Sequence, residues 1–303
     1  MKSDTVRPSS PVRVAVIGGG AIGGVLASSL HRAGHEVLQC VRSPFGELVV
    51  EEQAGEHRVP ARIVTTPEGL APVAWVFLTV KAHDTGSTEP WLRALAGSGT
   101  TVVVAQNGID HVERVQPLAP EAEILPALAL IAAERVAPGR VRRHFGGALV
   151  VPSGRAGSAL AAVLDGGGLD VRLASDFTTE AWRKLLSNVA ANPITALTLR
   201  RMDVFDDPEV RSLAQALVRE AAAVGAAAGA DVGEQDVRDV FALSGLFTAD
   251  NGTSMLYDRL AGLPLEHDLI NGAVVRTAER LGVPAPLNRT MLTLARAVRA
   301  DAA

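Results

Sequence analysis

A cluster of five glycines between residues 18 and 24 most constrains the fold of this chain. It follows an apolar run at 12–17 and leads into a helical pattern over 21–33, which stops at Gly34. Glycines favour a tight loop over a continuous apolar helix, because without a Cβ they enter backbone conformations closed to other residues. The segment therefore predicts a buried strand, a sharp turn and a helix, rather than a signal peptide or a membrane span.

Short apolar runs alternate with helical stretches up to about residue 175. The runs at 35–41, 73–80 and 101–105 are nearly all apolar, as in parallel strands that helices cover on both faces. This rhythm predicts an α/β chain that begins with a Rossmann-like doubly wound sheet. Two strand-like runs flank Gly146-Gly147, which predicts a hairpin turn there. A helix at 156–164 and a strand at 171–174 complete the domain.

Beyond residue 175 only helical patterns remain, at 178–195, 208–230, 234–243, 265–281 and 287–300. The change in pattern predicts a domain boundary. We expect a polar tail at 1–11, a Rossmann domain at 12–175 and an all-helical C-terminal domain at 176–303. The apolar helical domain leaves open a homodimer.

Composition excludes several classes of function. The 29 basic residues are scattered and outnumbered by 33 acidic ones, and aromatic residues are 4% of the chain, so no nucleic-acid-binding face is expected. A single cysteine, Cys40, excludes an internal disulfide and a cysteine-rich metal site. The seven histidines show no ligand spacing, so we expect no metal. A protein of the reducing cytoplasm, without a membrane partner, is the expectation.

The glycine cluster fits the pattern G-x-G-x-x-G, and the strand before it and the helix after it are the context that this pattern requires. The first glycine permits the turn, the second lets a pyrophosphate approach the backbone, and the third lets helix and strand pack closely. The free N–H groups of the helix N-terminus favour a phosphate. The candidate dinucleotide-binding residues are Gly18, Gly19, Gly20, Ala21, Ile22 and Gly23.

Arg42 indicates which dinucleotide is bound. Sites for NAD usually place an acidic residue at the end of the second strand, on the ribose 2′-hydroxyl. This strand ends with Arg42 instead, and a guanidinium suits a 2′-phosphate. The sequence therefore favours NADP, while an ordinary surface arginine is the alternative.

Two polar residues follow apolar runs, near the ends of predicted strands. Lys81 follows the run at 76–80, and Asn107 follows the run at 102–106. Ligands of open α/β sheets bind beyond the carboxyl ends of strands, so both residues are candidates for contact with the cofactor. The alternatives are a solvated loop lysine and an Asn-Gly turn.

A polar stripe marks the helical domain. Lys184, Asn188 and Asn192 are spaced four residues apart, which places them on one face of a helix. Pro193 should disturb this helix where the stripe ends. One cation and two amides suit an anionic, oxygen-rich small molecule, and the lysine could donate a proton. A solvent-facing polar stripe is the alternative.

Five segments occur in one order: GGGAIG, LTVKA, AQNGI, WRKLLSNVAANPITAL and SMLYDRLAGLPLEHDLING. Together they resemble the ketopantoate reductase (2-dehydropantoate 2-reductase) family over roughly residues 12–281. The resemblance implies a Rossmann domain, a helical domain and a site in the cleft between them. It also implies reduction of a small 2-keto acid, ketopantoate, to (R)-pantoate with NADPH, on the route to pantothenate and coenzyme A.

The resemblance implies roles for single residues. The catalytic residues would be Lys184 and Glu266. Lys184 would donate a proton to the keto oxygen, and Glu266 would lie near the nicotinamide ribose and Lys184. The substrate would contact Asn188, Asn192, Asn251 and Ser254. The cofactor would also contact Lys81 and Asn107. Arg42 would bind its 2′-phosphate, and Ala133 would lie in a loop beside the nicotinamide.

The chain also departs from the family pattern. His83-Asp84 stands where the family often has a cofactor-holding Gln or Asn, and an acid there does not help a 2′-phosphate. The segment at 200–205 lacks the substrate loop that the family often has. Two alternatives therefore stay open: a dehydrogenase of another 2-keto or 2-hydroxy acid, which could use NADH, and an NAD(P)-binding sensor without turnover.

Overall fold

The structure is a computed structural model that describes residues 11–244 and 252–298. The polar tail expected at 1–11 lies, except for its last residue, outside this range. The chain forms two compact units. The first comprises the described residues up to 106 and residues 110–177, and the second comprises residues 107–109 and those from 178 onward.

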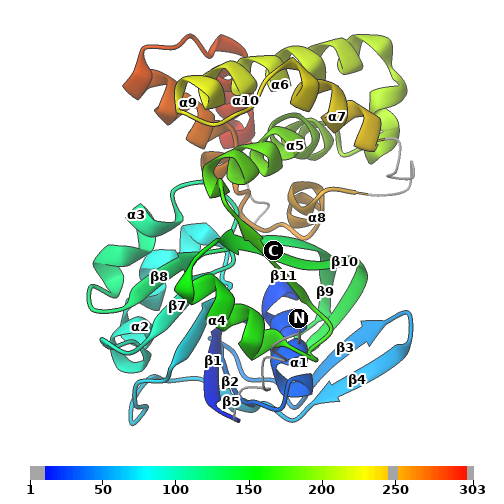
Figure 1. The fold of residues 1–303 in the computed structure, drawn as a ribbon. Helices are drawn as coiled ribbons and strands as arrows, with labels where there is room; N and C mark the ends of the chain where they lie inside the picture. The colour runs from blue at the N-terminus through cyan, green and yellow to red at the C-terminus, as the bar shows by residue number, and fades with distance from the viewer. Residues whose placement is uncertain (1–10, 245–251, 299–303) are drawn as a thin grey trace, which may run out of the picture. The chain divides into compact units, whose positions relative to one another are not determined.

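The first unit contains a six-stranded parallel sheet in the order β5-β2-β1-β6-β7-β8 (Figure 1). This is the classical dinucleotide-binding order, in which ligands bind where the strand order reverses. Here the reversal lies between β1 and β6. The strands are β1 (Arg13–Ile17), β2 (Glu36–Cys40), β5 (Arg62–Val64), β6 (Trp75–Leu78), β7 (Thr101–Val104) and β8 (Glu123–Pro126).

The side chains of β1 point alternately into two hydrophobic cores, one on each face of the sheet. Val14 and Val16 face the core that contains helix α1 (Ala21–Arg32), whereas Ala15 and Ile17 face the core on the opposite side of the sheet. Successive strand residues point to opposite faces. Both faces of β1 are therefore covered, which explains its continuous apolar sequence. Shorter elements complete this part: η1 (Ala82–Thr88), α2 (Glu89–Leu95), α3 (His111–Val115) and η2 (Gln116–Leu118).

A second sheet contacts the other side of α1. Its order is β11-β10-β3-β4, with β9 antiparallel to β10. The strands are β3 (Leu48–Glu52), β4 (Gly55–Val59), β9 (Leu128–Ala137), β10 (Arg140–Pro152) and β11 (Asp170–Ala174), and helix α4 (Arg155–Leu164) joins the last two.

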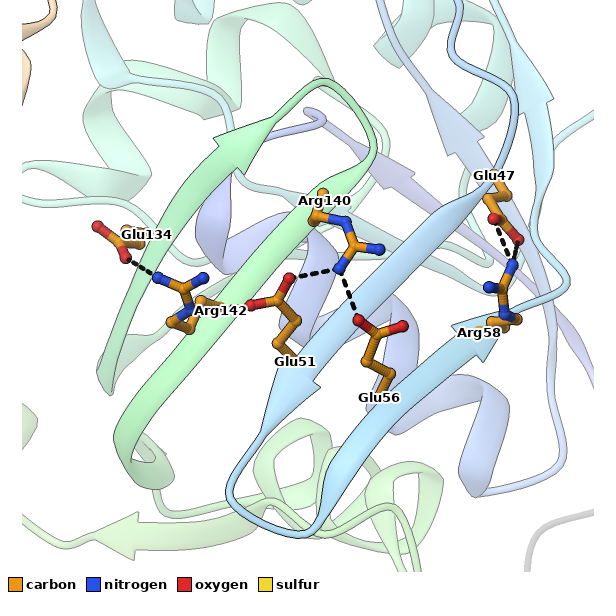
Figure 2. A network of polar contacts seen from close by, with 7 residues as sticks. All are labelled: Glu47, Glu51, Glu56, Arg58, Glu134, Arg140 and Arg142. Atoms are coloured by element: carbon orange, nitrogen blue, oxygen red, sulfur yellow. Dashed lines mark hydrogen bonds and ion pairs between the residues drawn. The ribbon is translucent and has the colours of Figure 1, made fainter.

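Charged side chains connect four strands of this sheet (Figure 2). Glu51 on β3 accepts hydrogen bonds from Arg140 and, at 2.8 Å, from Arg142 on β10. These two guanidinium groups lower the pKa of Glu51 below its ordinary value. Arg140 also bonds Glu56 on β4, and Arg142 bonds Glu134 on β9. The pairs join β10 to its neighbours β3 and β9, and Arg140 also reaches past β3 to Glu56 on β4.

The hairpin turn expected at Gly146-Gly147 is wrong. β10 runs through both glycines, and the hairpin turn is at Pro138-Gly139, where Gly139 has φ +75°. Gly146 has φ +77°, and the register of β10 against β9 shifts between Gly146 and Ala148. A glycine pair inside a strand can produce such an irregularity instead of a turn.

The second unit contains helices and no strand among its described residues (Figure 1). Its core joins apolar side chains of α5, α6 and α9, among them Leu186, Leu217 and Val274. The helices are α5 (Phe177–Thr198), α6 (Pro208–Ala227), α7 (Glu234–Ser244), α8 (Ser254–Leu260), α9 (Asn271–Leu281) and α10 (Pro286–Ala297), with short turns η3 (Met202–Asp206) and η4 (His267–Leu269).

The disturbance expected at Pro193 does not end the helix. α5 continues through this proline to Thr198. Within residues 11–244 and 252–298, no helix is both long enough and apolar enough to cross a membrane.

Candidate active site

The glycine loop joins β1 to α1 at the point where the strand order reverses. Gly18 has φ +121°, and a Cβ there would lie 2.7 Å from Thr79 Oγ1. A Cβ on Gly23 would lie 2.1 Å from the carbonyl oxygen of Gly18. Both positions therefore require glycine, one for its backbone conformation and both for the close packing of the turn.

Gly20 differs from these two glycines. Apart from the adjoining residues and the backbone of α1 itself, no heavy atom lies within 4 Å of the position that its Cβ would occupy. As the N-cap residue of α1 it provides no side-chain cap, and the first turn contains no acidic residue. The N-terminus of α1 therefore combines open space beside the backbone with the partial positive charge of the helix, which suits a phosphate. These glycines fit a dinucleotide.

Two polar residues that the sequence analysis missed hold this loop. Gln39 Nε2 donates to the carbonyl oxygen of Gly18 at 2.8 Å, and Thr79 Oγ1 donates to that of Ile17 at 3.0 Å. Gln39 is fully buried in β2, between the apolar residues Leu38 and Cys40. A polar residue within an apolar run was the signal that could have indicated it, because a buried polar group needs a hydrogen-bond partner.

Arg42 lies just beyond β2 and forms an ion pair with Asp84, with 3.4 Å between Nη2 and Oδ2. The arginine side chain is 80% exposed. The acid that departs from the family pattern is therefore paired with the arginine expected at the 2′-phosphate. Lys81, which is half-buried, directly precedes η1 on the same segment as Asp84.

Ala133 lies in a strand, which corrects the expectation of a loop. It is part of β9, where it pairs with Arg143 of β10. The long antiparallel pairing of β9 with β10 gives this segment backbone partners that a local sequence pattern does not reveal.

The polar stripe lies on α5, as the spacing predicts. Lys184 and Asn188 are half-buried, and Asn192 is 3% exposed. Burial lowers the pKa of Lys184 to about 8, and the negative charge of Glu266 partly opposes this shift. A lysine whose pKa lies near neutrality is suited to proton transfer.

Glu266 is buried just before η4 and accepts a hydrogen bond from Asn107 Nδ2 at 3.0 Å. Asn107 belongs by its contacts to the second unit, together with Glu266 and Lys184. The structure therefore groups Asn107 with the two catalytic candidates. No local sequence pattern predicts this contact, because the two partners lie 159 positions apart in the chain.

Asn192 Nδ2 is buried and has no hydrogen-bond partner among the described residues. A buried N–H group without a partner is costly. It is therefore available for an acceptor atom of a ligand, such as a carboxylate or hydroxyl oxygen.

Ser254 is the first residue of α8 and is exposed. The preceding Thr253 caps this helix through Leu256 N, and its hydroxyl lies 2.7 Å from that of Thr195 on α5. This contact places Ser254 close to the end of the polar stripe. Asn251, expected to bind the same substrate, lies outside the described residues.

Comparison with known families identifies both parts of the chain. Residues 14–156 match the family described as "Ketopantoate reductase PanE/ApbA", and residues 176–299 match its C-terminal domain. A 2-dehydropantoate 2-reductase of Caulobacter vibrioides is 40% identical over 93% of this chain and 97% of its own length. The chain belongs to the ketopantoate reductase family. The expected oxidoreductase class and the expected fold class, a Rossmann-like sheet followed by a helical domain, are confirmed.

Solved structures agree on the fold. A PanE/ApbA family ketopantoate reductase from Ralstonia eutropha JMP134 has a TM-score of 0.86 at 28% identity, covering 94% of this chain and 97% of its own. A D-mandelate dehydrogenase solved with NADH and anilino(oxo)acetate has a TM-score of 0.85 at 24% identity, with 94% and 97% coverage. The second likeness concerns the fold alone.

Proposed function

We propose that this chain reduces ketopantoate to (R)-pantoate with NADPH, in the cytoplasm, as a step toward pantothenate and coenzyme A. The observation that carries the proposal is Lys184 on the polar stripe of α5. Burial lowers the pKa of this lysine, and the charge of the buried carboxylate of Glu266 acts on it. Membership of the ketopantoate reductase family and the 40% identical relative support the choice of substrate.

Lys184 acts as the general acid in this proposal. When bound, NADPH supplies the hydride that the keto carbon accepts. Lys184 Nζ donates a proton to the keto oxygen as negative charge builds there. The negative charge of Glu266 favours the protonated form of Lys184, so the lysine can donate a proton at neutral pH.

The amides of the stripe orient the substrate. Asn192 Nδ2, which is buried without a partner among the described residues, donates to a carboxylate or hydroxyl oxygen. Asn188 lies one turn away on the same helix and binds the other end of the substrate. Ser254 contacts the substrate carboxylate. Holding reactants in a defined geometry lowers the entropic cost of reaction.

The glycine loop holds the dinucleotide. Gly20 and the N-terminus of α1 receive the pyrophosphate, because the backbone there is open and the helix dipole favours an anion. Arg42 binds the 2′-phosphate of NADPH after releasing Asp84. Lys81 lies on the segment that follows β6, at the same edge of the sheet. Ala133 on β9 stays a proposed nicotinamide contact. A homodimer also stays a prediction.

The test is consumption of NADPH by the purified protein with ketopantoate, run beside pyruvate and 2-ketoisovalerate and repeated with NADH. We expect the highest kcat/KM with ketopantoate and NADPH. Faster turnover of another keto acid would assign the chain to a different 2-keto acid. Tight cofactor binding without turnover of any substrate would favour a sensor.

A further inference from the structure

Pro193 leaves one backbone carbonyl of α5 without its helical donor. In an α-helix the N–H of residue 193 would donate to the carbonyl oxygen of Val189, four residues earlier. Proline has no N–H, and its ring crowds that carbonyl. α5 nevertheless continues from Phe177 to Thr198. Something other than the helix backbone must therefore satisfy the oxygen of Val189.

A side chain from another helix supplies the missing donor. Asn271 Nδ2, at the start of α9, donates to the Val189 oxygen at 2.9 Å. Both residues are fully buried, so water does not substitute for this bond. The amide thus replaces the N–H that position 193 lacks.

Neighbouring groups fix which end of the Asn271 amide faces α5. Asn271 Nδ2 also donates to Asn288 Oδ1 at 3.0 Å. Asn288 Nδ2 in turn donates to the Leu217 carbonyl and to Glu220 Oε1. Glu220 also accepts from the backbone N–H of Leu287 at 3.0 Å. Because two acceptors face the same NH₂ group, a flipped amide would place oxygen against oxygen.

We propose that Asn271 is a positioning residue that repairs the proline interruption of α5 and so fixes the stripe of Lys184, Asn188 and Asn192. Residues that precede proline disfavour the helical conformation. Asn192 precedes Pro193, so its side-chain direction depends on how firmly this turn is held. The effect on the helix is independent of the reaction, whereas the effect on substrate binding rests on the proposed function.

The decisive experiment is a double-mutant cycle of Asn271→Ala and Pro193→Ala, read by the urea midpoint of unfolding and by the KM for ketopantoate. Asn271→Ala should lower the midpoint and raise this KM about tenfold or more, with the KM for NADPH changed less than about twofold. Pro193→Ala restores an N–H at position 193. In that background we expect Asn271→Ala to change the KM less than about threefold and the midpoint only slightly.

Equal effects of Asn271→Ala in both backgrounds would overturn the proposal. If Asn271→Ala does not fold, Asn271→Asp keeps the volume of the side chain. Its ionised carboxylate would face two acceptors, so stability should fall as pH rises, and fall less with Pro193→Ala present. Equal pH dependence in both backgrounds would also overturn the proposal. If the wild type does not reduce ketopantoate, the proposed function fails, and the unfolding measurements still decide the role of Asn271.

Discussion

The two units build their candidate sites from different materials. The first unit offers backbone: glycines form a tight turn, and the N-terminus of α1 has neither a side-chain cap nor an acidic residue in its first turn. The second unit offers side chains, with Lys184 and Asn192 on α5 and Glu266 before η4. The backbone site depends on glycines that lie close together in the sequence, because they leave the backbone open. A side-chain site depends on partners from distant segments, such as Asn107.

Removing the lysine tests the side-chain site most severely. Lys184→Ala should lower kcat by about 10²–10⁴, because general acid help of that size is lost. The affinity for NADPH, measured by fluorescence titration, should change only a few-fold. Arg183→Ala is the matched control, since this neighbouring cation is exposed and pairs with Glu180 and Asp236. Turnover like the wild type in Lys184→Ala would remove the lysine from its role.

Two alanine substitutions test the backbone site. Gly20→Ala should weaken NADPH about tenfold or more with little change in melting temperature, because its Cβ enters open space where the pyrophosphate would lie. Gly23→Ala should lower the melting temperature, because its Cβ would meet the Gly18 carbonyl. Unchanged NADPH affinity in Gly20→Ala would argue against binding at this turn.

Substitutions of Arg42 and Asp84 test whether a side chain of the first unit also contributes to dinucleotide binding. Arg42→Ala should weaken NADPH about tenfold and NADH much less, since only NADPH carries the 2′-phosphate. Asp84→Asn should tighten NADPH by releasing the arginine. Arg13→Ala, which removes an exposed ion pair at the other end of β1, is the control. Equal losses for both dinucleotides in Arg42→Ala would reject the assignment.

The pH profile measures the coupling of Lys184 to Glu266. The protonated lysine is the donor, so kcat for reduction should fall as pH rises through about 8. Glu266→Gln removes a charge that raises the pKa of Lys184, and the falling limb should therefore move to lower pH. A limb that stays in place would show that another group controls it.

The smallest effect concerns Leu199 in the second unit, a non-glycine residue with a positive φ. Every other described residue with positive φ is a glycine, whereas Leu199 has φ 55° just after α5. Leu199→Gly should raise the free energy of unfolding by about 0.5–1 kcal/mol, because an L-residue pays for this conformation. Leu213→Gly inside α6 is the control, with the opposite sign expected. A loss of stability in Leu199→Gly would contradict this account.

The sequence predicted what local pattern determines. Patterns that repeat every few residues predicted the strand, turn and helix around Gly18 and the polar face of α5. The structure contains these elements. The pattern missed β3, β4 and β5, which are short and partly exposed. It also misread Gly146 as part of a turn, and it did not predict that Asn271 supports α5 at Pro193, because β9 and Asn271, the partners that decide these points, lie elsewhere in the chain. The roles of the predicted site residues stay predictions.

The excursion of residues 107–109 has a practical consequence for anyone who wishes to dissect this protein. The chain leaves the first unit after Gln106, returns at Asp110 and leaves again after Phe177. An excised fragment that begins at Thr178 would carry Lys184 and Glu266 but lack Asn107, the amide donor of that carboxylate. A single cut in the gene therefore cannot deliver an intact catalytic half.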